Sequence, residues 1–401
     1  MSATAMRDSA WAVFLVFLRL GLTSFGGPVA HLGYFHAEFV ARRRWLGESA
    51  YADLVALCQF LPGPASSQVG MALGLSRAGY RGALAAWAGF TLPSAVLLVL
   101  FALGVSHLGQ ALPPGLLHGL KVAAVAVVAQ AVWNMARSLC TTGRTIGIMV
   151  AAAWAATLLP YAWVQVAILA VAGLVGRLWL APSGPPGTQA LPVPIGRRAG
   201  AGWLLVFAVL LVGLPMAAAL HPDHVLALAD AFYRAGSLVF GGGHVVLPLL
   251  QAEVVPPGWV DNDVFLAGYG AAQAVPGPLF TFAAFIGASL PGQPSGWAGA
   301  ALCLAAIFLP SFLLVAGALP YWERVRHGAG VRAALAGINA AVVGLLAAAL
   351  YHPVWTSAIL RPTDYVLALL AVMALAAWRL PAWLVVAGCA VLGALSAAWL
   401  P

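Results

Sequence analysis

Long apolar stretches alternate with short polar ones along the whole chain. The apolar segments lie at 10–34, 48–75, 82–107, 115–137, 145–159, 162–180, 203–220, 225–250, 262–290, 296–321, 331–352, 363–379 and 381–400. A helix that crosses a lipid bilayer needs about 20 predominantly apolar residues. The pattern therefore predicts a series of membrane helices joined by short loops. One longer stretch rich in proline and glycine, at 181–202, is the plausible linker between two halves.

Four of the apolar segments are interrupted. Segments 10–34 and 225–250 contain a glycine cluster, and segments 48–75 and 262–290 contain Pro-Gly-Pro. Both interruptions break a helix and leave backbone N–H and C=O groups without intrahelical partners. Exposing such groups to lipid is too costly, so broken backbone at membrane depth lines a cavity or a bound ion. We expect the four breaks to lie together and to form a binding site.

The same interruptions recur in the same order, 214 or 215 residues later. The matching positions include Arg19 with Arg234, Gly26-Gly27 with Gly241-Gly242, Glu38 with Glu253, Gln59 with Gln273, and Gly63 with Gly277. This agreement predicts a duplicated chain. Segment 203–220 has no counterpart, and one extra crossing between two equal repeats inverts the second relative to the first. We therefore predict a first repeat at 1–180, a linker at 181–202, an extra helix at 203–222 and a second repeat at 223–401.

The composition supports a membrane protein. Of the 401 residues, 63% are apolar and only 7% are charged. Soluble proteins have about 25% charged residues, so the composition argues against a soluble enzyme, a disordered chain and a nucleic-acid-binding protein. No enzyme motif or metal-ligand spacing is present, so we expect no enzyme activity and no cofactor. The predicted fold class is an all-α polytopic integral membrane protein with two inverted-topology repeats that contain broken or re-entrant helices.

The net charge of +8 comes mostly from arginines in short loops, which indicate the orientation in the membrane. If the broken segments enter and return on one side, the chain makes nine crossings, with 15 basic residues in inside loops and one in an outside loop. If they cross straight through, the chain makes thirteen crossings and the tally is 12 to 4. The charge bias favours the re-entrant path. Both paths place the N-terminus in the cytoplasm and the C-terminus outside.

A new half-helix begins after each break. Its N-terminus exposes free N–H groups and about half a positive charge, which suits an anion. The candidate substrate-binding residues near the breaks are Gly26, Gly27, His31, Gln59, Gly63, Ser66, Ser67, Gly241, Gly242, His244, Gln273, Gly277 and Thr281. We expect these residues to surround the substrate anion.

Arg19 and Arg234 lie inside apolar helices, about two turns before the glycine breaks. A charge at membrane depth is costly unless it is paired. One interpretation is that the guanidinium groups bind a tetrahedral oxyanion in a bidentate manner. The other is that they form ion pairs with Glu38 or Glu253 and hold the breaks together. Glu38 and Glu253 are also candidates for proton coupling.

At its breaks the chain resembles the chromate ion transporter (CHR) family in its long, two-repeat form. The resemblance rests on Phe25-Gly26-Gly27-Pro28 with His31, Pro62-Gly63-Pro64, Val239-Phe240-Gly241-Gly242-Gly243-His244 and Pro276-Gly277-Pro278. It implies a transporter of the bacterial inner membrane that exports chromate, with sulfate as a competitor, and that confers chromate resistance. The expected partners are the oxyanion and the lipid bilayer, not nucleic acid, and a homodimer stays open.

Two other functions stay open. The first is proton-coupled uptake of sulfate or another oxyanion, which requires Glu38 and Glu253 to titrate during transport. The second is a non-transporting membrane subunit, against which the paired broken helices argue. The membrane potential favours export: moving one charge through 100 mV is worth about 2.3 kcal/mol, so a dianion that leaves an inside-negative cell at roughly 150 mV gains about 7 kcal/mol.

Overall fold

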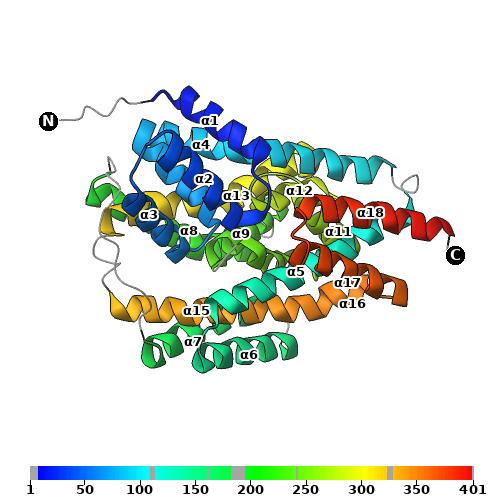
Figure 1. The fold of residues 1–401 in the computed structure, drawn as a ribbon. Helices are drawn as coiled ribbons and strands as arrows, with labels where there is room; N and C mark the ends of the chain where they lie inside the picture. Colours follow the sequence, from blue (N-terminus) through cyan, green and yellow to red (C-terminus); the bar gives the residue numbers. More distant parts are fainter. Residues whose placement is uncertain are drawn as a thin grey trace.

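The computed structural model describes residues 8–108, 113–159, 162–181, 195–221, 223–240, 243–322 and 328–399. Every regular element in these ranges is a helix (Figure 1). The first half contains α1 (Ala10–Thr23), α2 (Gly27–Phe35), the π-helix η1 (His36–Arg42), α3 (Glu48–Phe60), α4 (Ala65–Leu108), α5 (Pro114–Leu139), α6 (Gly143–Leu158) and α7 (Ala162–Trp179). The extra helix is α8 (Arg197–Leu220).

The second half repeats this order with shorter pieces. It contains α9 (His224–Leu238), η3 (Gly243–Val245), α10 (Val246–Val254), α11 (Asn262–Ala272), η4 (Leu279–Thr281), α12 (Phe282–Ala288), α13 (Gly296–Ala318), η5 (Leu319–Tyr321), α15 (Ala329–Ala349), η6 (Leu350–Trp355), α16 (Thr356–Ala358), α17 (Pro362–Ala376) and α18 (Ala382–Trp399). The predicted all-α fold with two repeats is confirmed in the part of the chain that the structure describes.

Glycines with left-handed backbone make the breaks. Between α1 and α2, Gly26 and Gly27 have φ angles of 100° and 77°, which residues with a side chain rarely adopt. Pro28 then occupies the first turn of α2, where no N–H is needed. At the two Pro-Gly-Pro tips, Gly63 and Gly277 have φ angles of 121° and 100°. The chain therefore leaves each helix through a turn that its glycine makes possible.

The glycine-broken segment of each repeat begins and ends close together in space. In the first repeat, Arg77 Nε lies 2.8 Å from Asp8 Oδ2 before α1, and the Arg77 guanidinium lies 5.2 Å from the centre of the Trp45 ring after η1. In the second repeat, the rings of His224 and Trp259, on either side of the α9–α10 segment, lie 5.3 Å apart. These contacts agree with segments that enter and return rather than cross.

The last two helices of each repeat form a hairpin that packs against a helix of the other repeat. Helices α6 and α7 pack along α15, and α17 and α18 pack along α5 (Figure 1). Gly119 of α5 directly faces the backbone of Cys389 in α18, and Gly337 of α15 directly faces the backbone of Ala172 in α7. A side chain at either glycine would collide with the opposite helix. The two hairpins are thus held in matching ways, as expected of inverted repeats.

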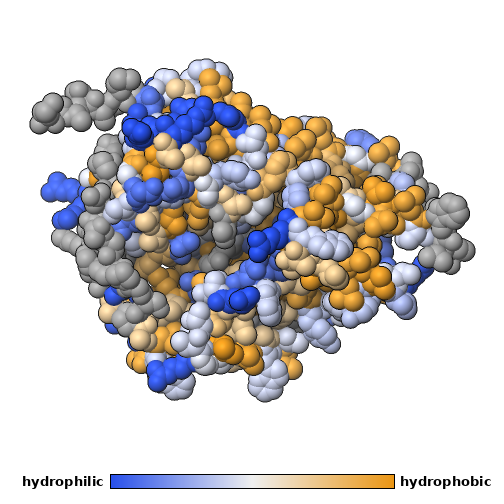
Figure 2. Space-filling view, viewed as in Figure 1, coloured by the Kyte–Doolittle hydropathy of each residue, from blue (hydrophilic) through white to orange (hydrophobic). Residues whose placement is uncertain are grey.

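Apolar side chains cover much of the outer surface (orange in Figure 2). Among the described residues, five helical stretches are long and apolar enough to cross a membrane, and shorter apolar helices accompany them. No residue in the most hydrophobic window of α8 is fully buried, and one side of this helix is exposed. In a bilayer this surface faces lipid, so the chain is a multi-pass membrane protein.

The predicted linker at 181–202 falls largely outside the described residues, which resume at Ile195. Gly196 is extended, with φ −76° and ψ 156°, and α8 begins at Arg197. The first turns of α8 therefore occupy the end of the range predicted as linker. The boundaries of the two repeats stay predictions.

Candidate anion-binding site

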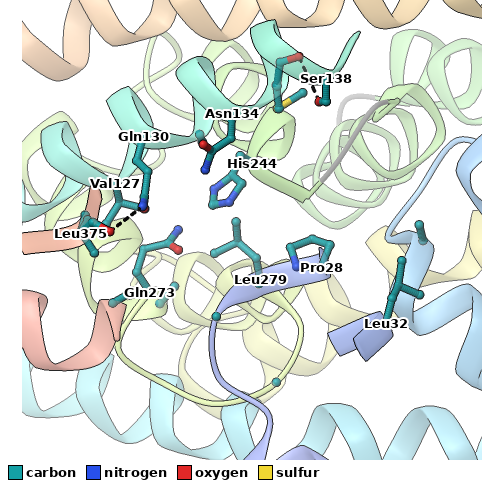
Figure 3. Close-up of a pocket in the computed structure, with 18 of the residues that line it drawn as sticks. Pro28, Leu32, Val127, Gln130, Asn134, Ser138, His244, Gln273, Leu279 and Leu375 are labelled. Carbon is teal, nitrogen blue, oxygen red and sulfur yellow. Dashed lines mark hydrogen bonds between the residues drawn. The ribbon is translucent and has the colours of Figure 1, made fainter. Parts of the chain in front are cut away.

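A cavity of about 840 Å³ lies at the junction of the two repeats. The first repeat contributes the start of α2, the α3–α4 tip and one face of α5, and the second contributes residues at the α9–α10 break, the α11–α12 tip and the α17–α18 turn. Figure 2 shows the hollow on this face of the molecule, and Figure 3 shows its lining. The breaks that the sequence singles out thus border one common cavity.

Each Pro-Gly-Pro tip is hydrogen-bonded to the glycine break of the other repeat. The Gly63 N–H donates to Val239 O at 2.7 Å, and the Gly277 N–H donates to Ser24 O at 2.9 Å. Ser24 and Val239 follow the last residues of α1 and α9, where carbonyl groups lack intrahelical partners. The tips therefore satisfy the groups that the breaks expose. As a consequence, the N–H groups of both glycines are already engaged.

Neither tip glycine has room for a side chain. A Cβ atom on Gly63 would lie 2.5 Å from Ser311 Oγ and 2.6 Å from Gln68 Nε2. A Cβ atom on Gly277 would lie 2.8 Å from Ser94 Oγ. Ser311 belongs to the second repeat and Ser94 to the first, so each tip is packed against the other repeat. Conformation and packing both require glycine at these two positions.

A row of polar side chains on α5 lines one wall of the cavity. Gln130, Asn134 and Ser138 follow one another at intervals of four residues, which places them on one face of the helix. Figure 3 shows Gln130 and Asn134 on the side of α5 that faces the cavity. Gln130 Nε2 also donates to Leu375 O of α17 at 3.1 Å. The sequence analysis missed this row, although polar residues four apart in an apolar helix are a signal that could have found it.

Nitrogen donors from the second repeat lie on the opposite wall. His244 Nδ1 lies 3.0 Å from the Tyr269 hydroxyl, and its Nε2 lies on the side of Gly27, where a Cβ atom would be 3.8 Å away. Gln273 follows the last residue of α11, and its Nε2 is buried without a hydrogen-bond partner among the described residues. In Figure 3 the His244 ring and the Gln273 amide face the α5 row. Amide and imidazole groups therefore face one another across the cavity.

Among the described lining residues, Arg379 is the one with a permanent charge. It lies in the exposed turn between α17 and α18, at the rim of the cavity. Arg379 is one of the 15 basic residues that the re-entrant path assigns to inside loops, and the sequence pattern does not connect it with the site. Arg379 lies far from the breaks in the sequence. Only the packing of α17 and α18 against α5 brings its turn to the cavity.

The predicted site residues divide into three groups. The cavity is lined by Gly26, Gly27, Gln59, Gly63, His244, Gln273 and Gly277. Outside its lining lie Arg19, His31, Ser66, Ser67, Arg234 and Thr281. Gly241 and Gly242 fall outside the described residues.

The predicted site residues that do not line the cavity include four buried polar residues behind the tips, His31, Ser66, Ser67 and Thr281. His31 Nδ1 lies 3.4 Å from Ser66 Oγ, and both residues are almost fully buried. Thr281 Oγ1 donates to Pro278 O at 2.8 Å. Ser67 is buried as well, and its Oγ has no hydrogen-bond partner in the described ranges. These side chains support the tips and do not reach the cavity surface.

The two intramembrane arginines have different surroundings. Arg234 donates through Nη1 and Nη2 to both carboxylate oxygens of Glu253, each at 2.9 Å, and through Nε to Asp230 at 2.9 Å. Arg19 lies on the exposed face of α1, and no ion pair joins it to a described residue. The ion-pair interpretation therefore describes Arg234 and does not describe Arg19.

The two candidate proton-coupling residues are both engaged in ion pairs. Glu38 accepts from Arg42 Nη1 at 3.0 Å and from Arg43 Nε at 2.6 Å. Glu253 is bound to Arg234, as described above. Neither glutamate belongs to the described lining of the cavity.

The described residues offer no obvious metal site. No group of three or more His, Cys, Asp or Glu side chains in these ranges could hold a metal ion. The four cysteines, Cys58, Cys140, Cys303 and Cys389, are buried and free. What the cavity does offer is N–H donors and one guanidinium, a combination that suits an oxyanion.

Comparisons with known proteins match both halves of the chain. The chromate transporter family model matches residues 11–177 and 226–394. A chromate transport protein of Cupriavidus metallidurans is 27% identical over 94% of this chain and 91% of its own length. A chromate transport protein of Pseudomonas aeruginosa is 30% identical over 84% of this chain and 79% of its own length. An uncharacterized transporter of Methanocaldococcus jannaschii is 26% identical over 85% of this chain and 83% of its own length.

No solved structure matches the chain. The family match covers most of both repeats and leaves out the stretch between them, where the linker and α8 lie. The matched ranges span well over half of the sequence and include cavity-lining residues of both repeats. The chain therefore belongs to the chromate transporter family.

Proposed function

We propose that the protein is a secondary transporter that exports chromate across the inner membrane, with sulfate as a competing substrate, and that it confers chromate resistance. The cavity between the repeats carries the proposal. Its described lining contains an arginine and no carboxylate, so it attracts anions and disfavours cations. The relationship to chromate transport proteins supports chromate as the oxyanion.

The cavity walls supply hydrogen bonds for a tetrahedral dianion. Gln130, Asn134 and Gln273 offer amide N–H groups. When the Tyr269 hydroxyl donates to His244 Nδ1, the neutral imidazole carries its proton on Nε2 and donates on the side of Gly27. Chromate and sulfate have the same shape and charge, which explains why one would compete with the other. Donors on both walls would hold the anion between the repeats.

The shape of the cavity supports entry from the cytoplasm. The lining extends along α5 to Ser138 and Leu139, at the last turn of that helix. The loop that follows leads to Arg144, which the positive-inside rule places in the cytoplasm. With the N-terminus in the cytoplasm and the C-terminus outside, this end of the cavity faces the compartment from which chromate must be removed.

The membrane potential supplies the driving force in this proposal. A dianion that leaves an inside-negative cell at roughly 150 mV gains about 7 kcal/mol, so export needs no coupling ion on energetic grounds. Uptake of the same dianion needs at least two co-transported cations to cancel its charge. Glu38 and Glu253 are the predicted proton carriers, and both are paired with arginine outside the cavity lining.

The test is flux under a clamped potential. The purified protein is reconstituted in vesicles, the potential is set with valinomycin and potassium, and labelled chromate and sulfate are followed at equal pH on both sides. We expect chromate flux that follows the potential, with sulfate as a competitor. Flux that depends on a pH gradient and is lost in Glu38→Gln and Glu253→Gln would instead support proton-coupled uptake. No flux of either anion under any gradient would support a non-transporting subunit.

The proposed orientation has a separate test. In a background without the four native cysteines, Gly47→Cys and Pro257→Cys place a thiol in exposed loops that follow the broken segments of the first and second repeats. An impermeant thiol reagent should label Gly47→Cys only from the cytoplasmic side and Pro257→Cys only from outside. Labelling of both positions from one side would reject the inverted arrangement.

A further inference from the structure

We infer that Arg379 is the residue that supplies positive charge to the substrate anion, and that the α17–α18 turn holds it at the entrance of the cavity. The inference rests on the proposed function and names the charged group of that site. Three features of the structure carry it: the position of Arg379, the engagement of the other membrane-depth cations, and the way in which the turn is built.

The first feature is position. Arg379 lines the same cavity as the α5 row and the second-repeat donors, and no described acidic residue shares that lining. The side chain is exposed and has no ion-pair partner among the described residues. A guanidinium without a carboxylate partner beside a set of uncharged donors is available to an incoming dianion.

The second feature is that the cations inside the apolar segments, Arg19, Lys121 and Arg234, are engaged or face away from the cavity. Arg234 is held by Asp230 and Glu253. Lys121 Nζ lies 2.8 Å from Asp263 Oδ1. Arg19 is on the outer face of α1 and does not line the cavity. Among the described residues, Arg379 is therefore the permanent cation that a dianion in the cavity can reach.

The third feature is the construction of the turn. Arg379 has a φ angle of 53°, in the left-handed region where a helix usually ends with glycine. The Leu380 N–H donates to Ala374 O at 2.9 Å, and Gln130 Nε2 donates to Leu375 O at 3.1 Å. The second bond ties the end of α17 to the polar row of α5. Gln130 is thus a positioning residue for the turn that carries Arg379.

The first experiment compares Arg379→Gln and Arg379→Lys with Arg198→Gln, a matched loss of one exposed arginine that does not line the cavity. Chromate flux is measured in vesicles against chromate concentration. Hydrogen bonds to charged groups are strong enough that we expect Arg379→Gln to raise the half-saturating concentration about ten- to a hundredfold. Arg379→Lys should keep part of the affinity, and Arg198→Gln should behave like the wild type. An unchanged half-saturating concentration in Arg379→Gln overturns the inference.

The second experiment separates charge from shape. Arg379→Cys is made in the background in which Cys58, Cys140, Cys303 and Cys389 are replaced by alanine. A cationic methanethiosulfonate reagent that attaches ethylammonium should restore chromate affinity, and an anionic reagent that attaches ethylsulfonate should not. Chromate should also slow the reaction at this thiol. Equal restoration by both reagents would show that only side-chain bulk matters and would overturn the inference.

A binding measurement distinguishes failure of the inference from failure of the proposed function. Sulfate should raise the thermal unfolding temperature of the detergent-solubilised wild type and should do so at much higher concentration for Arg379→Gln. If the wild type shows this shift but transports neither anion, the transport proposal fails and Arg379 keeps its role. If sulfate and chromate shift neither protein, or shift both alike, the role of Arg379 is rejected.

Discussion

The same arginine of the repeated motif has opposite surroundings in the two halves of the molecule. In the second repeat, Arg234 binds Glu253 and Asp230 in a half-buried cluster. In the first repeat, Arg19 is exposed on an apolar helix face. The glutamate that corresponds to Glu253 is Glu38, which binds the loop arginines instead. A motif that is nearly symmetric in sequence thus gives an asymmetric distribution of charge.

Two sequence differences explain the asymmetry. Asp230 is matched at the 215-residue offset by Leu15, so the first repeat lacks the second carboxylate that holds Arg234. The first repeat also has arginines four and five residues after its glutamate, at Arg42 and Arg43, where they pair with Glu38. Arg234 therefore stabilises the fold through its ion pairs, whereas Arg19 is available for another role or another partner.

The largest expected effect is the removal of Arg234. Arg234→Leu leaves Asp230 and Glu253 without their cation. Breaking a buried pair costs about 3–5 kcal/mol, and because Arg234 is partly exposed we expect a cost at the lower end of this range. We expect a sharp fall in the thermal unfolding temperature in detergent and in the amount of folded protein. Adding Asp230→Asn and Glu253→Gln to Arg234→Leu should recover much of the loss. Equal unfolding temperatures for the wild type and Arg234→Leu would contradict a structural role for the ion pair.

The next largest effect is expected at the two Pro-Gly-Pro tips, which are alike in the two repeats. Gly63→Ala and Gly277→Ala introduce a Cβ atom at a left-handed position beside a serine of the other repeat, with a backbone strain of about 1–3 kcal/mol. Both variants should lose most of their chromate flux per inserted molecule. Gly47→Ala, where a Cβ atom meets nothing within 4 Å, is the matched control. Normal flux in both tip variants would mean that the tips do not shape the site.

Arg19→Leu should have a small effect on the single chain. Without an ion-pair partner in the described part of the chain, its loss should change the free energy of unfolding by less than about 0.5 kcal/mol. The homodimer that the sequence leaves open gives this variant a second readout, because an exposed charge at membrane depth needs a partner. If a second copy covers this face, native mass spectrometry should show fewer dimers for Arg19→Leu than for the wild type. An unchanged dimer fraction would place the dimer contact elsewhere.

Modest effects on stability are expected at Ser67 and Thr281, which occupy matching positions at the offset of 214. Thr281→Val removes the hydrogen bond to Pro278 O and should cost about 0.5–1.5 kcal/mol of unfolding free energy. Ser67→Ala removes a hydroxyl without a partner in the described ranges and should be neutral. Thermal unfolding of the two variants checks the difference. A larger loss of chromate flux in Ser67→Ala than in Thr281→Val would show that the hydroxyl contacts substrate after all.

The membrane fold and its breaks could be predicted from sequence because they depend on local properties. An apolar segment of sufficient length must be a membrane helix, since lipid offers no partner to the backbone. Glycine clusters and Pro-Gly-Pro interrupt such a helix wherever they occur. The 214- and 215-residue offsets then identified the duplication without any knowledge of contacts.

The composition of the site could be predicted only in part. The described break glycines (Gly26, Gly27, Gly63 and Gly277), both glutamines and His244 were found because they adjoin the interruptions, and they line the cavity. The α5 row was missed because it belongs to an uninterrupted helix. Arg19 and Arg234 were proposed for the site because they stand out as charges in apolar segments, but sequence does not tell which way a helix faces.

By itself, the sequence determined that the chain is an α-helical membrane protein of two repeated halves with broken helices, because hydrophobic length and backbone interruption act within a single segment. Only the tertiary structure decided which charges meet the cavity. It turned Arg19 outwards, enclosed Arg234 between two carboxylates and brought Arg379 to the rim by packing α17 and α18 against a helix of the other repeat. Charge pairing depends on distances between segments far apart in sequence, which only the packed helices define.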